Sequence, residues 1–163
     1  MTLMKLLSSC SVLLLSACSV EDASTRPCTN MWCQEGLTIS FSPPLRDPGR
    51  YTIALVADGQ TLRCEASLPF KHCDTRARCN DSSIVLMEAG CALPANEHAF
   101  MGLTMRTIPR DVELTVEHER AGIGAWAARI TPQCGYPNGA ACDQRQCCSA
   151  VISAQLAWQE ASP

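Results

Sequence analysis

The feature that most constrains the fold of this chain is its cysteine content, twelve in 163 residues. Two cysteines belong to the N-terminal apolar segment, and ten remain in the rest of the chain. An even set of cysteines in an exported chain is typical of a disulfide framework, in which each bridge contributes about 2–4 kcal/mol. Ten cysteines allow roughly a thousand pairings, so the sequence does not choose among them. The predicted disulfide partners are Cys28, Cys33, Cys64, Cys73, Cys79, Cys91, Cys134, Cys142, Cys147 and Cys148.

Residues 1–17 have the layout of a secretory signal peptide. Lys5 is the only charge before an apolar run over residues 6–15, and the small residues Ser16 and Ala17 follow it. A run of this length is too short to span a bilayer, and no second stretch approaches the roughly 20 apolar residues that a transmembrane helix needs. We therefore expect residues 1–17 to be cleaved, residues 18–27 to form a lipidated N-terminus and tether, and residues 28–163 to form a single disulfide-rich β domain.

Leu15-Ser16-Ala17-Cys18 resembles the lipobox of bacterial lipoproteins, in which a branched apolar residue and two small residues precede a cysteine. The resemblance implies cleavage before Cys18, a diacylglycerol on its sulfur and usually a third acyl chain on its amino group. Two or more chains give stable membrane attachment. Ser19 stands where lipoproteins of the inner membrane typically carry aspartate, which implies the outer membrane. The alternative is an ordinary signal peptide that happens to be cut near a cysteine.

A second resemblance comes from the C-terminal part of the chain. Tyr136-Pro137-Asn138-Gly139, followed by Cys142 and Cys147, is similar to the ending of small cysteine-rich bacterial lipoproteins of unassigned function. Those proteins also share the Pro-Gly-x-Tyr and Asp-Gly pieces of residues 48–51 and 58–59. The resemblance covers most of the mature chain through short motifs, and it implies no particular activity.

The charge of the mature chain argues against a nucleic-acid partner. Cleavage after residue 17 leaves twelve basic and sixteen acidic residues, a net charge of −4. Arg76 and Arg78 are close in sequence, but Asp74 and Asp81 bracket them, which indicates a solvated loop. The chain therefore lacks the basic footprint that phosphate backbones attract.

Short segments of alternating or continuous apolar residues predict an all-β fold. Asp58-Gly59 between two such segments is a strong hairpin signal, because both positions of its turn need a positive φ. Eight strands without a convincing amphipathic helix predict a disulfide-stapled antiparallel β-sandwich, immunoglobulin-like or transthyretin-like. A short helix remains an alternative for the last segment. The predicted strands cover residues 37–42, 51–57, 60–66, 83–87, 98–106, 112–117, 125–131 and 150–158.

Three details of this prediction concern strand ends and faces. Pro43-Pro44 is expected to end the first strand. Met101 is expected to share an inward face with Ala99, Leu103 and Met105, and Trp158 to point inward from the last strand. Residues 67–82 are expected to form a loop stapled by cysteines.

The spacing of the cysteines leaves several interpretations open. Cys28 and Cys33 are close enough to close a local loop, over which Trp32 would pack. Cys28-x₄-Cys33 and Cys142-x₄-Cys147 also come near the spacing of structural zinc sites. The adjacent pair Cys147-Cys148 allows a strained vicinal disulfide, although neighbouring cysteines more often pair elsewhere.

The three histidines give little support for catalysis. His72 and Cys73 are adjacent, yet sequence neighbours on an extended chain point apart. His118 ends the apolar face of residues 112–116 and is expected to lie at the edge of the core. His98 begins a predicted strand.

These observations predict a non-catalytic, lipid-anchored envelope lipoprotein that acts as a binding, adhesion or structural module without a cofactor or metal. Its expected partners are the membrane, through lipid on Cys18, and an envelope or extracellular protein or glycan held by loops at one end of the sandwich. The alternative is a redox-active or metal-handling exported protein that uses the cluster from Cys142 to Cys148.

Overall fold

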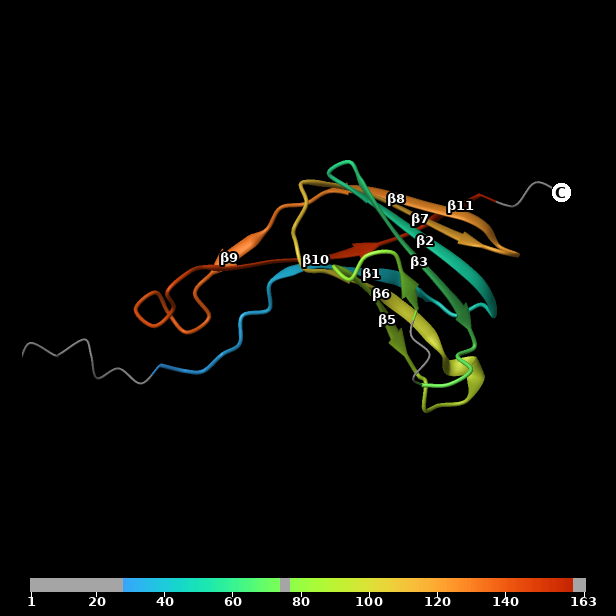
Figure 1. Ribbon diagram of the computed structural model, residues 1–163, viewed down its shortest axis with the longest axis horizontal. Coiled ribbons are helices and arrows are strands. Elements are labelled where there is room, and N and C mark those ends of the chain that lie inside the picture. The colour runs from blue at the N-terminus through green and yellow to red at the C-terminus, as the bar shows by residue number, and fades with distance from the viewer. Residues whose placement is uncertain (1–27, 74–76, 160–163) are drawn as a thin grey trace, which may run out of the picture.

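The computed structural model describes residues 28–73 and 77–159, which form two β-sheets packed face to face (Figure 1). The five-stranded sheet has the order β5 (Ile84–Ala89), β6 (Ala99–Met105), β1 (Gly36–Leu45), β10 (Cys147–Ala154), β9 (Gln133–Gly135). The six-stranded sheet has the order β11 (Ala157–Gln159), β8 (Gly122–Arg129), β7 (Asp111–His118), β2 (Gly49–Ala57), β3 (Gln60–Leu68), β4 (Arg78–Cys79). The only helical element in these ranges is a 3-10 turn over Ala95–Glu97. The predicted disulfide-stapled, all-β sandwich is confirmed.

The core lies between the two sheets and is built from alternate residues of facing strands. Leu37, Ile39 and Phe41 of β1 are at most 3% exposed, and Tyr51 and Ile53 of β2 are at most 1% exposed. Because successive side chains of a strand point to opposite faces, this alternation gives each sheet one buried face. The core is largely aliphatic, and Tyr51 and Phe100 meet edge to face within it at a ring-centroid distance of 5.4 Å.

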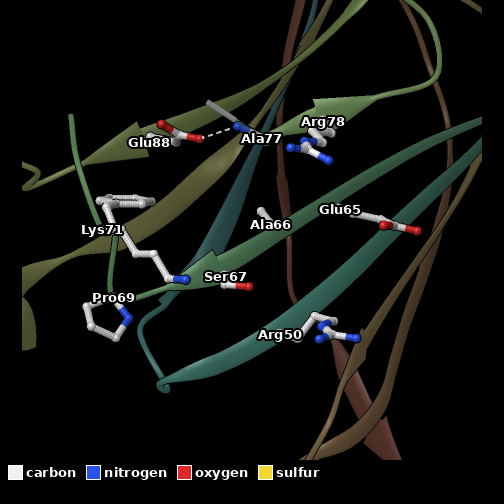
Figure 2. A pocket seen from close by; sticks show the side chains of 10 residues that line it. Arg50, Glu65, Ala66, Ser67, Pro69, Lys71, Ala77, Arg78 and Glu88 are labelled. Atoms are coloured by element: carbon white, nitrogen blue, oxygen red, sulfur yellow. Dashed lines mark hydrogen bonds between the residues drawn. The ribbon is translucent and has the colours of Figure 1, made fainter. Parts of the chain in front are cut away.

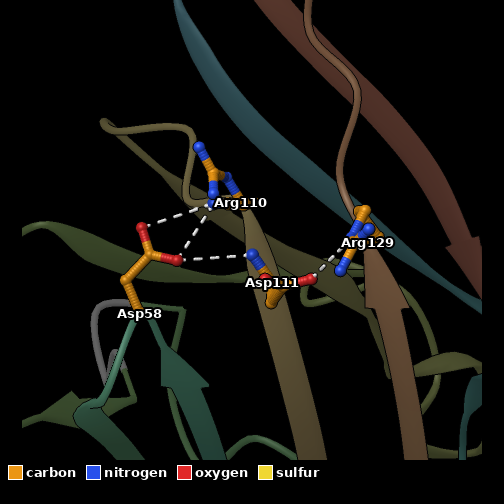
Figure 3. A network of polar contacts seen from close by, with 4 residues as sticks. All are labelled: Asp58, Arg110, Asp111 and Arg129. Carbon is orange, nitrogen blue, oxygen red and sulfur yellow. Dashed lines mark hydrogen bonds and ion pairs between the residues drawn. The ribbon is translucent and has the colours of Figure 1, made fainter.

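The predicted hairpin at Asp58-Gly59 joins β2 to β3, and both turn residues have positive φ, 48° and 85°. The Asp58 carboxylate also accepts hydrogen bonds from the backbone N–H groups of Arg110 and Asp111, at 3.0 and 3.3 Å (Figure 3). Arg129 in turn pairs with Asp111 at 3.1 Å. The turn therefore fixes the entry of the chain into β7 as well as its own hairpin.

β1 and β10 form a parallel pair in a fold whose other described pairings are antiparallel. The register runs from Gly36 beside Ser149 to Phe41 beside Ala154. A parallel pair needs a long connection, and here almost the whole domain lies between the two strands. The first and last long strands of the domain are consequently neighbours in one sheet.

Pro43-Pro44 does not end the first strand, and that prediction was wrong. β1 continues to Leu45, and its ladder with β6 shifts register between Ser40 and Leu45, so that the prolines fall in the irregular stretch. A proline has no N–H to contribute to a ladder, and an interrupted stretch needs none.

Met101 does not share the inward face of its strand, because β6 contains a bulge. Gly102 pairs with Met87 and Phe100 with the next residue of β5, Glu88, which leaves Met101 without a partner. The extra residue reverses the alternation. Met101 is therefore 36% exposed, whereas Phe100 is fully buried.

The last predicted strand is in fact two strands in different sheets. β10 ends at Ala154 in the five-stranded sheet, and β11 begins at Ala157 in the six-stranded sheet beside β8. Trp158 is 41% exposed as a result, and its indole lies over Gly124, where a Cβ atom would approach it within 3.1 Å. Neither the inward Trp158 nor the alternative helix is found.

Residues 67–82 form a loop only in part. β3 extends to Leu68, and β4 (Arg78–Cys79) pairs with it, Cys79 lying opposite Cys64. Cys64–Cys79 links these edge strands, and Cys73–Cys91 links the loops that follow β3 and β5. Both bridges lie along the side of the sandwich where β4 and β5 are the outer strands.

Candidate functional site

All ten cysteines that the sequence predicted as disulfide partners are bonded. Two bridges lie in the sandwich, and three lie in a projection formed by residues 28–35 and 133–148, which we call the arm (Figure 1). The arm leaves the sandwich at the end opposite to β11. The five bridges are Cys28–Cys142, Cys33–Cys147, Cys64–Cys79, Cys73–Cys91 and Cys134–Cys148.

Two bridges of the arm continue the parallel arrangement of β1 and β10, with the register shifted by one residue. Cys28–Cys142 and Cys33–Cys147 each have a sequence separation of 114 residues, whereas Gly36 and Ser149, the first pair of the β1–β10 ladder, are 113 apart. The two Cys-x₄-Cys segments therefore run side by side in the same direction. The predicted local loop from Cys28 to Cys33 was wrong, because each of these cysteines bonds to the partner segment instead.

Polar contacts also hold the two halves of the arm together. The Asn138 side chain accepts from the Met31 N–H at 2.6 Å and donates to the Met31 carbonyl at 3.0 Å. Asp143 accepts from the Asn138 side-chain amide at 2.8 Å and fixes its orientation. Arg145 and Glu35 form an ion pair at 2.7 Å. The arm is consequently ordered although none of its residues is fully buried.

The arm exposes large apolar side chains. Trp32 is 91% exposed, Met31 58% and Tyr136 40%. The expectation that Trp32 packs over a neighbouring bridge was wrong, because Cys33 bonds across to Cys147 and leaves the indole outside. No sequence signal separated these two outcomes.

Cys147 and Cys148 do not bond to each other. Since neighbours on β10 point to opposite faces, Cys147 reaches Cys33 and Cys148 bonds to Cys134, its direct partner on β9. The cluster from Cys142 to Cys148 therefore presents disulfides and no thiolate ligands. Across the described ranges, no group of three or more His, Cys, Asp or Glu side chains could hold a metal ion.

Neither His98 nor His72 lies beside a free thiol in the described residues. His98 accepts a hydrogen bond from the Phe70 N–H at 2.9 Å, makes a second contact from Nε2 to the Leu93 carbonyl at 3.0 Å and stacks on the Phe70 ring. His72 is exposed, and its neighbour Cys73 is bonded to Cys91.

His118 lies at the end of β7 and is 5% exposed, as expected for a histidine at the edge of the core. Its Nδ1 accepts from the Ala121 N–H at 3.0 Å, while the buried Nε2 has no hydrogen-bond partner within the part of the chain described. The imidazole packs against Tyr51, whose hydroxyl donates to the Asp47 carbonyl at 2.7 Å. Burial, reinforced by the Asp47 charge, raises the pKa of Tyr51 to about 12.

A groove of about 260 Å³ lies beside the edge of the six-stranded sheet, and we call it the cationic groove (Figure 2). Arg50, Lys71 and Arg78 supply three cations, and Ala66 and Phe70 supply apolar surface. Of its two carboxylates, Glu88 accepts a hydrogen bond from the Ala77 N–H at 2.9 Å, and Glu65 pairs with Arg63 at 3.6 Å. Three cations against two carboxylates give the lining of the groove a net positive charge, in a molecule whose net charge is negative.

The residues of the groove come from separate parts of the chain. Arg50 is the second residue of β2, Glu65 to Ser67 lie near the end of β3, Lys71 follows that strand, and Arg78 lies in β4. A second depression adjoins the groove along β5 and shares Ala77 and Glu88 with it. Arg78, interpreted from sequence as part of a solvated loop, thus contributes to a site, whereas Arg76 lies outside the described residues.

The predicted lipidation site Cys18, the signal peptide of residues 1–17 and the tether of residues 18–27 also lie outside the described residues. Among the helices of the described part, none is long and apolar enough to cross a membrane. In comparisons with known proteins, no family model, curated protein or solved structure matches the chain.

Proposed function

We propose that the protein is one of the small cysteine-rich bacterial lipoproteins, attached to the outer membrane by lipid on Cys18. The motif Leu15-Ser16-Ala17-Cys18 supports the anchor. Complete pairing of the ten remaining cysteines agrees with it, because disulfides persist in exported proteins and are rare in the cytosol.

We further propose that the sandwich is a non-catalytic binding module whose ligand occupies the cationic groove. The observation that carries this proposal is the grouping of Arg50, Lys71 and Arg78 around Ala66 and Phe70. Charge-assisted hydrogen bonds from such cations favour carboxylate or phosphate groups, and the apolar surface favours a ligand with an uncharged body. An acidic segment of an envelope protein or an acidic glycan has this chemistry.

Substitution of Cys18 tests the anchor. Cys18→Ala should abolish both the acyl mass on the N-terminal peptide and the incorporation of radiolabelled fatty acid, because the substituted residue has no sulfur to carry the diacylglycerol. Cys10→Ala is the matched control, since it removes a cysteine from the same segment and should change neither property. If Cys18→Ala protein still incorporates radiolabelled fatty acid, the anchor is wrong.

The membrane assignment has its own test. Ser19→Asp should move the acylated protein from the outer to the inner membrane in a density-gradient separation. Unchanged distribution would contradict the assignment to the outer membrane while leaving the anchor intact.

Photo-crosslinking from Ser67, a residue that lines the groove, tests the binding module. In intact cells we expect a discrete crosslinked protein or glycan, which should disappear when Lys71→Ala and Arg78→Ala are combined. Arg129→Ala is the control, because this exposed cation at the end of β8 forms an ion pair with Asp111 alone among the described residues, and its loss costs at most about 1 kcal/mol. A crosslink that the double substitution leaves unchanged would overturn the assignment of the ligand to the groove.

A further inference from the structure

The arm combines two properties that are seldom found together, a fixed backbone and an exposed apolar surface. Trp32, Met31 and Tyr136 are all exposed, and the Trp32 side chain, at 91%, is almost entirely in solvent. Tryptophan is on average a highly buried residue, and three large apolar side chains exposed within one 24-residue segment indicate a surface that another phase or partner covers.

The arm is also poor in charge. Its 24 residues contain only Glu35, Asp143 and Arg145 as charged groups. Glu35 and Arg145 neutralise each other at 2.7 Å, and Asp143 accepts two hydrogen bonds at 2.8 Å from the backbone and side chain of Asn138. Little charge has to be desolvated when this surface leaves water.

The bridges hold the exposed side chains in place. Met31 and Trp32 lie between Cys28 and Cys33, both of which are bonded to the partner segment, and both backbone polar groups of Met31 bond to Asn138. Binding through this surface would therefore order little additional backbone, which removes one of the main costs of association.

We infer that the arm carries a membrane-contact surface, with Trp32, Met31 and Tyr136 at the interface of the bilayer that carries the lipid of Cys18. The inference rests on the proposed anchor. Trp and Tyr favour the headgroup level of a bilayer, because their rings are apolar and carry one polar group.

The length of chain before the arm favours the bilayer over other occupants. Ten residue steps separate Cys18 from Cys28, which limits their distance to about 35 Å at full extension. The arm is thus the part of the domain nearest to the lipid along the chain, and it projects at the end opposite to β11 (Figure 1). Contact through the arm would hold the sandwich and its cationic groove away from the bilayer.

Fluorescence of the acylated full-length protein in vesicles tests the inference. The protein is reconstituted into vesicles of phosphatidylethanolamine and phosphatidylglycerol, with or without phosphatidylcholine brominated near the headgroup. We expect brominated lipid to quench part of the tryptophan emission, and we expect Trp32→Phe to remove that quenching. Trp158→Phe is the matched control, because Trp158 is the other exposed tryptophan but lies on β11, and its loss should leave the quenching unchanged.

Three other results would overturn the inference, and the measurements distinguish them. Acylated protein without quenching, or quenching that persists in Trp32→Phe, shows that the arm does not meet the lipid. Emission that changes with protein density but not with brominated lipid assigns the surface to a second copy of the chain. Absence of the acyl mass from the reconstituted protein instead indicates failure of the anchor, and is measured on the same sample.

Discussion

The sandwich and the arm achieve order by different means. The sandwich buries a continuous aliphatic core between two sheets and contains two disulfides. The arm contains three disulfides in 24 residues and has no fully buried residue. The comparison shows that covalent bridges and side-chain amides can fix a segment that has no buried core, and that such a segment is free to expose apolar side chains for another purpose.

The largest effect is expected from the two bridges that share a separation of 114 residues. With Cys33–Cys147 intact, Cys28–Cys142 closes a ring of only about twelve residues, so removing either bridge should cost about 3 kcal/mol. Removing both releases the long loop as well and should cost about 8 kcal/mol by the same chain-entropy relation. Denaturant unfolding of the Cys→Ala pairs and of the quadruple variant measures this. If the cost of removing both bridges equals the sum of the two single costs, the two bridges do not close a common ring.

A core substitution should affect the sandwich far more than a similar substitution affects the arm. Phe100 is fully buried against Tyr51 and Phe70, and Phe100→Ala should lower the free energy of unfolding by about 3–5 kcal/mol. Tyr136→Ala on the arm is the control and should change it by no more than about 0.5 kcal/mol. Similar losses for the two variants would show that the arm has a core of its own.

Gly36, the first residue of β1, lies at the junction between the arm and the sandwich. Its φ is 112°, and a Cβ atom there would lie 2.2 Å from the Met105 carbonyl oxygen. Gly36→Ala should therefore cost about 1–3 kcal/mol in thermal or denaturant unfolding. Gly135→Ala in β9 meets no atom within 4 Å and should be nearly neutral. A neutral Gly36→Ala would mean that the junction can rearrange.

The smallest effect is the pH dependence that Tyr51 gives to the sandwich. The pKa of Tyr51 is about 12 in the folded protein, above its ordinary value of 10.0, so the folded state favours the neutral phenol. Its contribution is fully present below pH 10 and is lost as the pH rises toward 12. Unfolding midpoints measured across this interval should fall more steeply for the native chain than for Tyr51→Phe. Parallel curves would exclude Tyr51 as the source.

Local signals predicted the sandwich well. Leu37, Ile39 and Phe41 alternate with polar residues and are buried as expected, and Asp58-Gly59 forms its hairpin because few other dipeptides tolerate the turn. The bulge at Met101 was missed, since an extra residue in a strand leaves no trace in a short apolar pattern.

Contacts between distant segments were not predictable. A Cys-x₄-Cys spacing suits a local loop as well as two parallel segments, and only the three-dimensional register decides between them. The cationic groove could not be predicted either, because Arg50, Lys71 and Arg78 approach one another only after β2, β3 and β4 have paired.

The parallel pairing of β1 with β10 has a consequence for biosynthesis. A chain that emerges from its N-terminus exposes Cys28 and Cys33 well before Cys142 and Cys147 exist as partners. During that interval the two early thiols can bond to each other or to Cys64, and such premature bridges must be exchanged before the domain closes. Maturation of this protein should therefore depend on disulfide isomerisation more than on oxidation, with the early cysteines as its slowest participants.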